Sequence, residues 1–443
     1  MGEISRSPMN PSDLGTHNRH RIVAAVRQHS GLSRAAIARM SGLSKGAVTT
    51  IVQHLIQRGL LVEQEGAVDG GTGRQQRNGR DGQTEQAGRN GNDAAGRTGR
   101  RGVLLALNPN YATAIGVEIT DARADAIAVD VTGQTRGDAS RSFPSDAAPC
   151  VIIAAVAEAV REVVAGLPGE WRSVRGIGVA LPGLVDAAMG LSLWIPGLVN
   201  WHEVPVVALL QRELGRPVFM DWRAYTATLA EQWWGQGRAA DEFLCVNVGD
   251  GVGLGIVHGG QLFRGTSSMA GMLAHLQMPG AEGGPVCVCG NAGCLQTQVS
   301  VPALLHRAQR ALADGVRSVL SAPAQTGDES LTFDRLIAAA RGGDKLACNL
   351  FEDAGAALGI AIANLIHLFN PPLIIVGGAL ARADDLLLEQ IQRSARRAAL
   401  APMFDAARIT FSTLRPGPAI LGATALVFEQ VLEQDAKTIS GPE

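Results

Sequence analysis

The sequence lacks a large net charge, a long apolar run and an apolar leader. Its 443 residues carry 39 Lys or Arg against 41 Asp or Glu, and this balance argues against a protein that coats nucleic acid along its whole length. The longest apolar stretch, residues 354–369, is interrupted by Asn364 and His367, which predicts a buried helix and no membrane span. The first ten residues are polar, so we expect no signal peptide and a cytoplasmic location.

The near-zero net charge hides an uneven distribution. Residues 1–101 carry 15 Lys or Arg against 8 Asp or Glu, whereas the remainder carries 24 against 33. A basic head before an acidic body suits a chain whose head meets DNA and whose body does not. The length predicts two or three domains, and an apolar fraction of 46% is ample for their cores.

Residues 33–59 carry the pattern of two helices joined by a tight turn. Ser33 and Ser44 are suited to cap the two helix starts, because a serine hydroxyl accepts a hydrogen bond from an unpaired backbone N–H. Gly42 lies between them and supplies the positive φ that such a turn needs. The residues that the first helix is expected to bury are Ala36, Ile37 and Met40.

The second helix of this pair has one apolar and one polar face. Its apolar residues recur at helical spacing, and they are Val48, Ile51, Val52 and Leu55. The polar face carries Lys45, Thr49, Thr50 and Gln53. Such side chains reach phosphates and base edges, so the pattern predicts the recognition helix of a helix-turn-helix. A helical hairpin that serves only as core is the alternative.

The segments around this pair predict a winged helix-turn-helix over residues 18–107. A helix precedes it near Ile22, and strands are expected at 60–63 and 103–107. Residues 66–99 between these strands are rich in Gly, Arg, Asn and Gln, which predicts a disordered insert at the wing tip, and residues 1–17 are expected to form a flexible leader. The arginines of this insert have two possible interpretations. They add nonspecific phosphate contacts, or the insert is a solvated loop with no role. The candidate DNA-binding residues are Arg34, Ser44, Lys45, Thr49, Thr50, Gln53, Arg100 and Arg101.

Strand and helix patterns alternate in two series from Asn108 onwards. The first series has strands at 114–119, 124–131, 176–180 and 217–220, with helices at 150–164 and 222–234. The second begins with strands at 243–248, 253–257 and 261–264, and continues with helices at 301–314, 330–341, 345–369 and 381–398, strands at 373–376 and 408–412, and a helix at 418–433. This alternation predicts an α/β body of two lobes with a cleft between them.

Three of the six cysteines lie within eight residues, at Cys287, Cys289 and Cys294, and His275 lies upstream of them. In a cytoplasmic protein such a cluster favours a metal site over disulfides. Three thiolates and one imidazole form the closed tetrahedral set that is typical of structural zinc. The sequence therefore predicts a structural Zn²⁺, and buried free cysteines are the alternative.

Together with the head and the cysteine cluster, several further segments resemble the ROK family of repressors, open reading frames and sugar kinases. Within this family, the chain resembles the transcriptional regulators of the xylose or N-acetylglucosamine repressor type. The resemblance covers residues 18–434 apart from 66–99. The further segments are Gly99-Arg100-Arg101, Leu107-Asn108-Pro109, Ala180 to Asp186, Val199-Asn200-Trp201, Gly249 to Gly253, Gly271 to His275 and Asn370 to Gly378.

This resemblance implies a two-lobed body with the actin-like ATPase fold, which is ribonuclease H-like, behind the N-terminal winged helix-turn-helix. Lobe 1 would span residues 108–222 and be completed by the last helix, residues 418–434. Lobe 2 would span residues 223–417 and contain the zinc knuckle, residues 275–294.

Two departures from the kinases of the family argue against catalysis. Their first phosphate loop contains Asp-x-Gly-Gly-Thr, whereas this chain has residues 118–122 without a glycine, and side chains there block the approach of phosphate to backbone N–H groups. Their catalytic aspartate corresponds to Arg223, which is always protonated and accepts no proton. We therefore expect no enzyme activity and no catalytic residue, with a sugar kinase of unusual base as the alternative.

The resemblance also places a ligand site in the cleft between the lobes. Its expected residues are Asn200, Trp222, Arg223, Met272, His275 and Gln296. Family carboxylates that hold sugar hydroxyls are replaced by Arg223, Met272 and Gln296. A guanidinium binds phosphate or carboxylate in a fork, so an anionic sugar derivative is one expectation. A cleft that binds nothing, with Arg223 in an internal ion pair, is the other.

These features together predict a DNA-binding transcriptional regulator, a repressor of carbohydrate-related genes, that is controlled by a sugar or sugar derivative in the cleft. The expected partners are double-stranded DNA, the small effector and further copies of the chain in a homodimer or homotetramer, with no membrane. Besides the kinase, the alternative is a ligand-free, zinc-stapled interaction protein.

Overall fold

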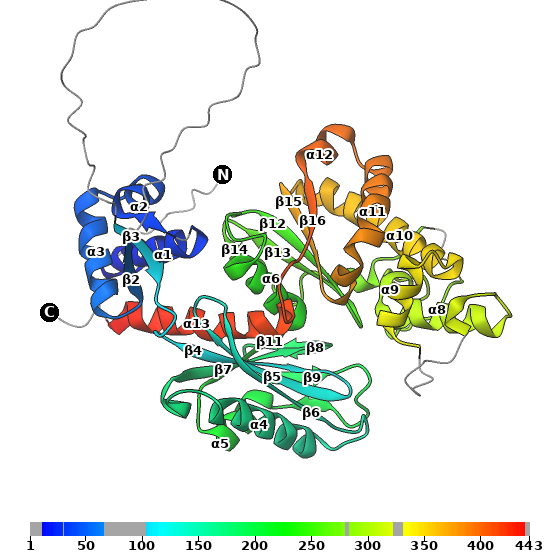
Figure 1. The fold of residues 1–443 in the computed structure, drawn as a ribbon, viewed down its shortest axis with the longest axis horizontal. Coiled ribbons are helices and arrows are strands. Elements are labelled where there is room, and N and C mark those ends of the chain that lie inside the picture. The colour runs from blue at the N-terminus through cyan, green and yellow to red at the C-terminus, as the bar shows by residue number, and fades with distance from the viewer. Residues whose placement is uncertain (1–10, 30, 66–102, 280–282, 322–330, 439–443) are drawn as a thin grey trace, which may run out of the picture. The chain divides into compact units, whose positions relative to one another are not determined.

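The computed structural model describes residues 11–29, 31–65, 103–279, 283–321 and 331–438, and it divides into two compact units, residues 1–108 and 109–443 (Figure 1). The head contains α1 (Pro11–Gln28), β1 (Leu32–Ser33), α2 (Arg34–Ser41), α3 (Lys45–Gln57), β2 (Leu61–Glu65) and β3 (Val103–Leu107). Its strands form one antiparallel sheet in the order β1-β3-β2, so the predicted wing pairing of β2 with β3 is confirmed.

Local capping explains why the head's helices begin and end where they do. The Ser33 hydroxyl accepts a hydrogen bond from the Ala36 N–H, and the Ser44 hydroxyl accepts one from the Ala47 N–H, both at 3.2 Å. Gly42 ends α2 with a φ of 66°, as predicted. The Asn108 side-chain amide donates to the Gly59 carbonyl at 2.7 Å and fixes the exit of β3.

Two sequence expectations for the head need correction. Met40 is 47% exposed, and α2 buries Ile37, Ala38 and Ser41 instead, so its inward face is rotated by one residue from the predicted one. The first helix begins at Pro11, within the leader predicted for residues 1–17, and proline is well suited to a first helical position. Residues 1–10 and the predicted insert 66–99 lie outside the described residues.

The body is built on two five-stranded sheets that share one plan. The elements of its first half are β4 (Thr113–Ile119), β5 (Arg123–Asp130), β6 (Thr135–Ser142), α4 (Pro149–Ala165), β7 (Val174–Leu181), β8 (Leu184–Asp186), β9 (Leu191–Trp194), β10 (His202–Val204), α5 (Val206–Leu214) and β11 (Val218–Trp222). The first sheet has the order β11-β7-β4-β5-β6, with β4, β7 and β11 parallel and β4, β5 and β6 antiparallel. The short strands β8, β9 and β10 form a separate antiparallel sheet.

The second half repeats this plan. Its elements are α6 (Arg223–Trp234), β12 (Phe243–Val248), β13 (Val252–His258), β14 (Gln261–Leu262), α7 (Gln296–Val299), α8 (Val301–Ala313), α9 (Phe333–Arg341), α10 (Lys345–Phe369), β15 (Leu373–Gly377), α11 (Asp384–Ala398), α12 (Ala401–Ala406), β16 (Arg408–Phe411) and α13 (Pro418–Thr438). The second sheet has the order β14-β13-β12-β15-β16, again an antiparallel hairpin followed by parallel strands.

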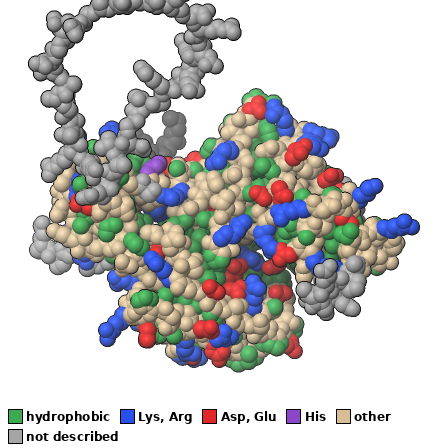
Figure 2. Space-filling model, in the orientation of Figure 1, with side chains coloured by type: hydrophobic (Ala, Val, Ile, Leu, Met, Phe, Trp, Pro, Cys, Tyr) green, Lys and Arg blue, Asp and Glu red, His purple; other side chains and the backbone are tan. Residues whose placement is uncertain are grey.

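The predicted elements are present in both sheets, whereas the edge strand β6 was missed. Its sequence, TRGDASRS, lacks an alternating apolar pattern because it pairs on one side only, with β5. The helix expected at 381–398 begins later, at Asp384, after a 3-10 turn over residues 379–383. On the face that Figure 2 shows, acidic and basic side chains are interspersed over the body, in keeping with its modest net charge.

One helix of the body, α10, is long and apolar enough to cross a membrane by length and composition alone. Its most apolar window is 61% buried inside the protein, and residues of α10 belong to the core beneath the second sheet. Burial of this kind is typical of a core helix, which is what the sequence predicts for residues 354–369.

The helices α6 and α13 pack against each other and join the two sheets (Figure 1). Helix α13 lies on β4 and β7 of the first sheet, and α6 lies on β12 and β13 of the second. The contacts are close enough to require glycine: a Cβ on Gly178 would lie 1.8 Å from the Ala423 carbonyl oxygen, and one on Gly422 would lie 1.6 Å from that of Thr226. Backbone therefore packs directly on backbone where α13 meets β7 and where it meets α6.

Substitution of Gly422 tests the importance of this crossing. We expect Gly422→Ala to lower the free energy of unfolding by about 3 kcal/mol, because the helices must separate to admit the methyl group. Gly137→Ala is the matched control, since its nearest neighbour would be a methyl group of Val163 at 4.0 Å. Melting followed by circular dichroism measures both variants, and equal melting temperatures would contradict the tight crossing.

Candidate functional site

The recognition helix predicted from the sequence, α3, presents its polar face to solvent. Val48, Val52 and Leu55 are buried in the head. The exposed residues of the opposite face are Ser44, Lys45, Thr49, Thr50 and Gln53. Ser44 caps the start of α3 and is itself exposed. The positive end of the helix and several hydrogen-bonding side chains therefore lie together on one solvent-facing surface of the head.

The remaining candidate DNA contacts differ from this group. The Arg34 guanidinium is paired with the Glu63 carboxylate at 2.6 Å, and this ion pair ties α2 to the wing strand β2. Arg34 is thus engaged in holding the head together. Arg100 and Arg101 lie outside the described residues.

The four predicted metal ligands, His275, Cys287, Cys289 and Cys294, come together, with all ligand atoms within 4.8 Å of one another. The Cys289 and Cys294 sulfurs are 3.7 Å apart, and the Cys287 sulfur lies 3.5 Å from His275 Nδ1. Tetrahedral zinc with its usual bond lengths requires about 3.8 Å between sulfurs and about 3.6 Å from sulfur to nitrogen. The donor set and its spacing therefore fit a tetrahedral zinc ion.

Backbone hydrogen bonds shape the loop that carries these cysteines. The Cys287 N–H donates to the Asn291 carbonyl at 2.8 Å, and the Gly290 N–H donates to the Cys287 carbonyl at the same distance. Gln296 Nε2 also donates to the Cys287 sulfur at 3.0 Å. A hydrogen bond to a ligating sulfur orients the ligand, so Gln296 supports the cluster from outside.

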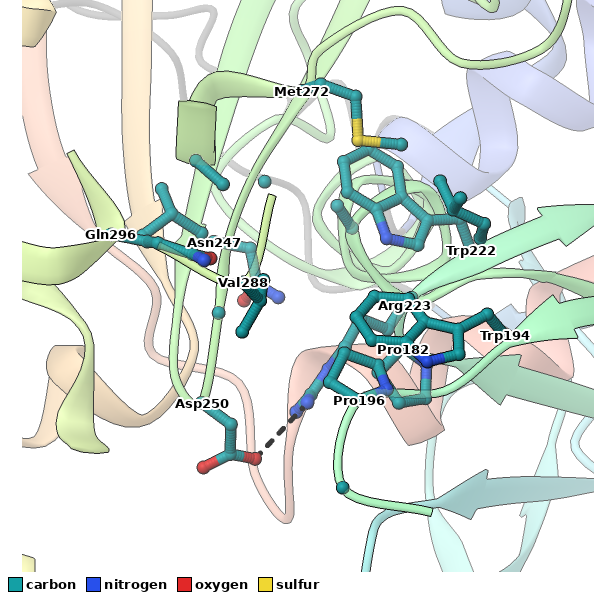
Figure 3. A pocket seen from close by; sticks show the side chains of 18 of the residues that line it. Pro182, Trp194, Pro196, Trp222, Arg223, Asn247, Asp250, Met272, Val288 and Gln296 are labelled. Carbon is teal, nitrogen blue, oxygen red and sulfur yellow. Dashed lines mark hydrogen bonds and ion pairs between the residues drawn. The ribbon is translucent and has the colours of Figure 1, made fainter. Parts of the chain in front are cut away.

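A cavity of about 340 Å³ lies between the two halves of the body (Figure 3). Of the predicted ligand residues, those that line it are Trp222, Arg223, Met272, His275 and Gln296. Asn200 is not among the lining residues, because its side-chain amide donates to the Asp146 carbonyl at 2.6 Å on the surface of the body. The prediction of Asn200 as a ligand contact is therefore corrected.

Arg223 is held in an ion pair with acids from both sheets. Its guanidinium lies 2.8 Å from Glu118 near the end of β4 and 3.4 Å from Asp250 after β12. Figure 3 shows the contact with Asp250. Burial alone would lower the pKa of Arg223, but Glu118 and Asp250 raise it above its usual value. Of the two expectations from the sequence, this arrangement corresponds to the internal ion pair.

The turn between β4 and β5 has no free cradle for phosphate. The Thr120 hydroxyl accepts hydrogen bonds from the N–H groups of Ala122 at 3.4 Å and Arg123 at 3.2 Å. Phosphate loops bind through unpaired backbone N–H groups, and here the turn's own side chain occupies them. The Asp121 carboxylate also lines the cavity at this turn and would repel a phosphate.

A second ion pair, which sequence reasoning missed, lies beside Arg223. Asp221 is 2% exposed and pairs at 2.6 Å with Arg264, which follows β14. Burial raises the pKa of Asp221, although the hydrogen bond from Arg264 acts in the opposite direction. The Arg264 guanidinium also lies 5.1 Å from the ring centre of Tyr225, whose hydroxyl donates to the Ala270 carbonyl. An acid near the end of a buried strand, two residues before Arg223, was the only sequence signal.

Two of the five tryptophans between residues 194 and 234, Trp194 and Trp222, line the cavity. Trp201 and Trp233 are almost fully buried, and the indole of Trp201 donates to the Ser192 hydroxyl at 2.8 Å. Most of this tryptophan-rich region is therefore core, and two aromatic faces remain for a ligand.

Comparison with known proteins agrees with this architecture. The family model described as "ROK family" matches residues 114–430, and the one described as "MarR family" matches residues 9–70. A xylose repressor of Caldicellulosiruptor bescii is 25% identical over 94% of this chain and 96% of its own length, and a glucokinase of Halalkalibacterium halodurans is 33% identical over 52% of this chain and 70% of its own. In fold, the chain is similar to a crystal structure of a ROK family transcriptional regulator described as a homolog of the Escherichia coli MLC protein. The TM-score is 0.71 at 24% identity, over 95% of this chain and 99% of that one.

The matched residues take in both sheets, the cavity between them and the cysteine cluster, and the resemblance first noted in the sequence is confirmed. The chain belongs to the ROK family.

Proposed function

We propose that this chain is a DNA-binding transcriptional regulator, a repressor of carbohydrate-related genes, whose DNA affinity depends on a small ligand in the body. The observation that carries this proposal is the polar face of α3, where Lys45, Thr49, Thr50 and Gln53 are exposed while Val48, Val52 and Leu55 hold the helix in place. A relative that matches nearly the whole chain is named a xylose repressor, which supports the same assignment.

The exposed residues of α3 have distinct proposed roles. Lys45 and the hydroxyls of Ser44 and Thr50 bind phosphates near the start of the helix, and Gln53 reads a base edge one turn further on. The Thr49 hydroxyl already donates to the Lys45 carbonyl at 2.8 Å, so in this conformation its proton is not offered to a phosphate. Arg100 and Arg101, which lie outside the described residues, are proposed to add phosphate contacts. We assign Arg34 to the internal structure of the head because Glu63 already pairs its guanidinium.

The ligand acts by shifting a conformational equilibrium. Trp222, Arg223, Met272, His275 and Gln296 face the cavity between the sheets, so a ligand there contacts both halves of the body. A ligand that binds one relative orientation of the halves more tightly favours that orientation. In a homodimer or homotetramer this would alter the spacing of two heads, which need half-sites about one helical turn apart.

Phosphoryl transfer is not part of the proposed function. A kinase needs a base near the acceptor hydroxyl, and Arg223 at the corresponding position carries a proton that it does not release near neutral pH. The hydrogen-bonded turn at Thr120 gives no cradle for a transferred phosphate. We propose that the protein works in the cytoplasm, where it has access to chromosomal DNA.

A gel-shift assay with the DNA upstream of the chain's own gene tests the DNA-binding role. Lys45→Ala should weaken binding to all sequences and reduce the salt slope of affinity by about one, because one phosphate contact is lost. Gln53→Ala should change the preference at one base pair, by about 1–3 kcal/mol, and leave the salt slope unchanged.

The chain has a matched control for the first substitution. Lys345→Ala removes the same charge from an exposed position at the start of α10 in the body, and we expect no effect on DNA binding. The proposal fails if Lys45→Ala and Lys345→Ala bind DNA equally well.

We also propose that His275, Cys287, Cys289 and Cys294 hold one structural zinc ion. Four protein ligands leave no position for water, so the metal would fix the loop and perform no chemistry. Elemental analysis should find one zinc per chain, and removal by a chelator should lower the melting temperature of the body.

Two cysteine substitutions separate zinc binding from a general effect of losing a thiol. Cys289→Ser should release the metal, whereas Cys150→Ser, an exposed cysteine outside the cluster, should retain it. An equal zinc content in both variants would exclude the proposed ligand set.

A further inference from the structure

The three cysteines of the cluster differ in their exposure to solvent. Cys287 is 4% exposed and Cys294 is 0% exposed, whereas Cys289 is exposed at the surface. The neighbouring side chains of Val286 and Val288 are 74% and 66% exposed, so this part of the loop belongs to the outer surface of the body. Oxidation of a cysteine follows its exposure, and a small oxidant in solvent therefore meets the Cys289 sulfur first.

A second sulfur lies within reach of Cys289. The Cys294 sulfur is 3.7 Å away, and a disulfide of about 2.05 Å requires an approach of about 1.7 Å. Gly290, next to Cys289, has a φ of 88°, and a Cβ there would meet no atom within 4 Å, so the turn has open space in which to move. The Cys287 sulfur, in contrast, accepts a hydrogen bond from the Gln296 amide at 3.0 Å. The contacts thus favour a bond between Cys289 and Cys294.

The other cysteines lack this combination of exposure and a nearby sulfur. Cys245 is fully buried, and its burial raises the pKa of the thiol above its usual value, which makes it unreactive. The Cys348 thiol donates to the Ala340 carbonyl at 3.4 Å. Cys150 is exposed but lies outside the cluster, so it serves as an internal reference for the reactivity of an ordinary surface thiol.

We propose that Cys289 and Cys294 form a peroxide-responsive pair, in which a disulfide between them replaces the zinc ion held by the cluster. This inference rests on the proposed zinc site. The Cys289 thiolate attacks one oxygen of hydrogen peroxide, the O–O bond breaks, and a sulfenic acid and a hydroxide ion result. The Cys294 thiolate then attacks the Cys289 sulfur, the S–S bond forms, and a second hydroxide ion leaves. The two sulfurs lose two electrons, which reduce one peroxide.

The disulfide removes two of the four metal ligands. A thiolate binds zinc and a disulfide sulfur does not, so only Cys287 and His275 remain as ligands and the ion is released. The loop then loses the constraint that the metal supplies. Val288, between two of the cysteines, lines the cavity of the body, and so does His275. Peroxide in the solvent would therefore alter one wall of the cavity from outside it.

Oxidation of the full, zinc-loaded chain with hydrogen peroxide tests this inference. A colour-forming chelator measures the zinc that is released. For the thiols, iodoacetamide first blocks those that are free, and N-ethylmaleimide labels those that reduction then liberates. Trypsin leaves the three clustered cysteines in one peptide, residues 265–307, so fragmentation of this peptide in the mass spectrometer assigns each label.

We expect one zinc released per chain, the second label on Cys289 and Cys294, and the first label on Cys287. Dithiothreitol with added zinc should restore the original state. Release of zinc without the second label on this pair would overturn the proposal, as would a second label on Cys287. An unchanged cluster under conditions that oxidise Cys150 would overturn it as well.

A substitution that retains a metal ligand separates the thiol chemistry from zinc binding. Cys289→Asp replaces the thiolate by a carboxylate, which also binds zinc but forms no disulfide, so peroxide should release the metal at least tenfold more slowly. The matched control, Cys150→Ser, should release it at the wild-type rate. Equal rates in the two variants would contradict the proposed pair. If Cys289→Asp does not hold zinc, the label positions in the wild-type chain decide the question.

The zinc content of the untreated protein tests the metal site separately. Zinc that is present at one per chain and is released without the pair of labels would remove this inference and leave the metal site standing. A chain without zinc would remove the metal site, whereas the second label on Cys289 and Cys294 would still support the disulfide.

Discussion

Three ion pairs cluster at the junction of β11 and α6, where the two halves of the body meet. Asp221 ends the first sheet's strand β11 and pairs with Arg264 of the second half, and Arg223 begins α6 and pairs with Glu118 and Asp250. Within the described part of the body, these pairs join the sheets on both sides of Trp222. The Asp221 side chain is 3% exposed, so removing its partner Arg264 would leave a buried charge uncompensated and destabilise this junction. These ion pairs act together with the packing of α6 against α13 in holding the two halves of the body around the cavity.

The same junction explains how a body with a kinase-like fold can keep a ligand-sized cavity without an open path for phosphoryl transfer. A phosphoryl-transfer enzyme keeps its phosphate path open and lined with N–H groups, cations or metal ions. Here Arg223 and its two acids occupy the space between the turn after β4 and the turn after β12, and the Thr120 hydroxyl takes the N–H groups of the first turn. What remains is a cavity whose shape depends on the relative orientation of the sheets, and a ligand can alter that orientation by differential binding.

Local features of this structure followed from the sequence, and long-range pairings did not. The serine caps, the positive φ at Gly42 and the strand at residues 114–119 depend on neighbouring residues, so they were predicted. The inward face of α2 was predicted one residue out of place, because the burial of Ser41 and exposure of Met40 depend on what the rest of the head packs against it.

The partners of Arg223 show the limit of sequence reasoning most directly. Glu118 precedes it by more than a hundred residues and Asp250 follows it by 27, so no periodicity connects them. The same holds for Asn200, which was placed at the cleft by resemblance and donates to the Asp146 backbone instead. Charge pairing within a cavity is a property of the assembled fold, and of the two expectations that the sequence left open for Arg223 the structure contains the internal ion pair.

The cysteine cluster and the cavity are adjacent and have residues in common, although they were predicted as separate features from the sequence. His275 lines the cavity and belongs to the cluster, and Gln296 lines the cavity while its amide donates to the Cys287 sulfur. Val288, between two of the cysteines, lines the cavity as well. A change in the order of the cysteine loop must therefore alter the shape that a ligand meets. The zinc ion proposed for this cluster would therefore also fix one side of the cavity, and a ligand bound there would act mainly on the other side.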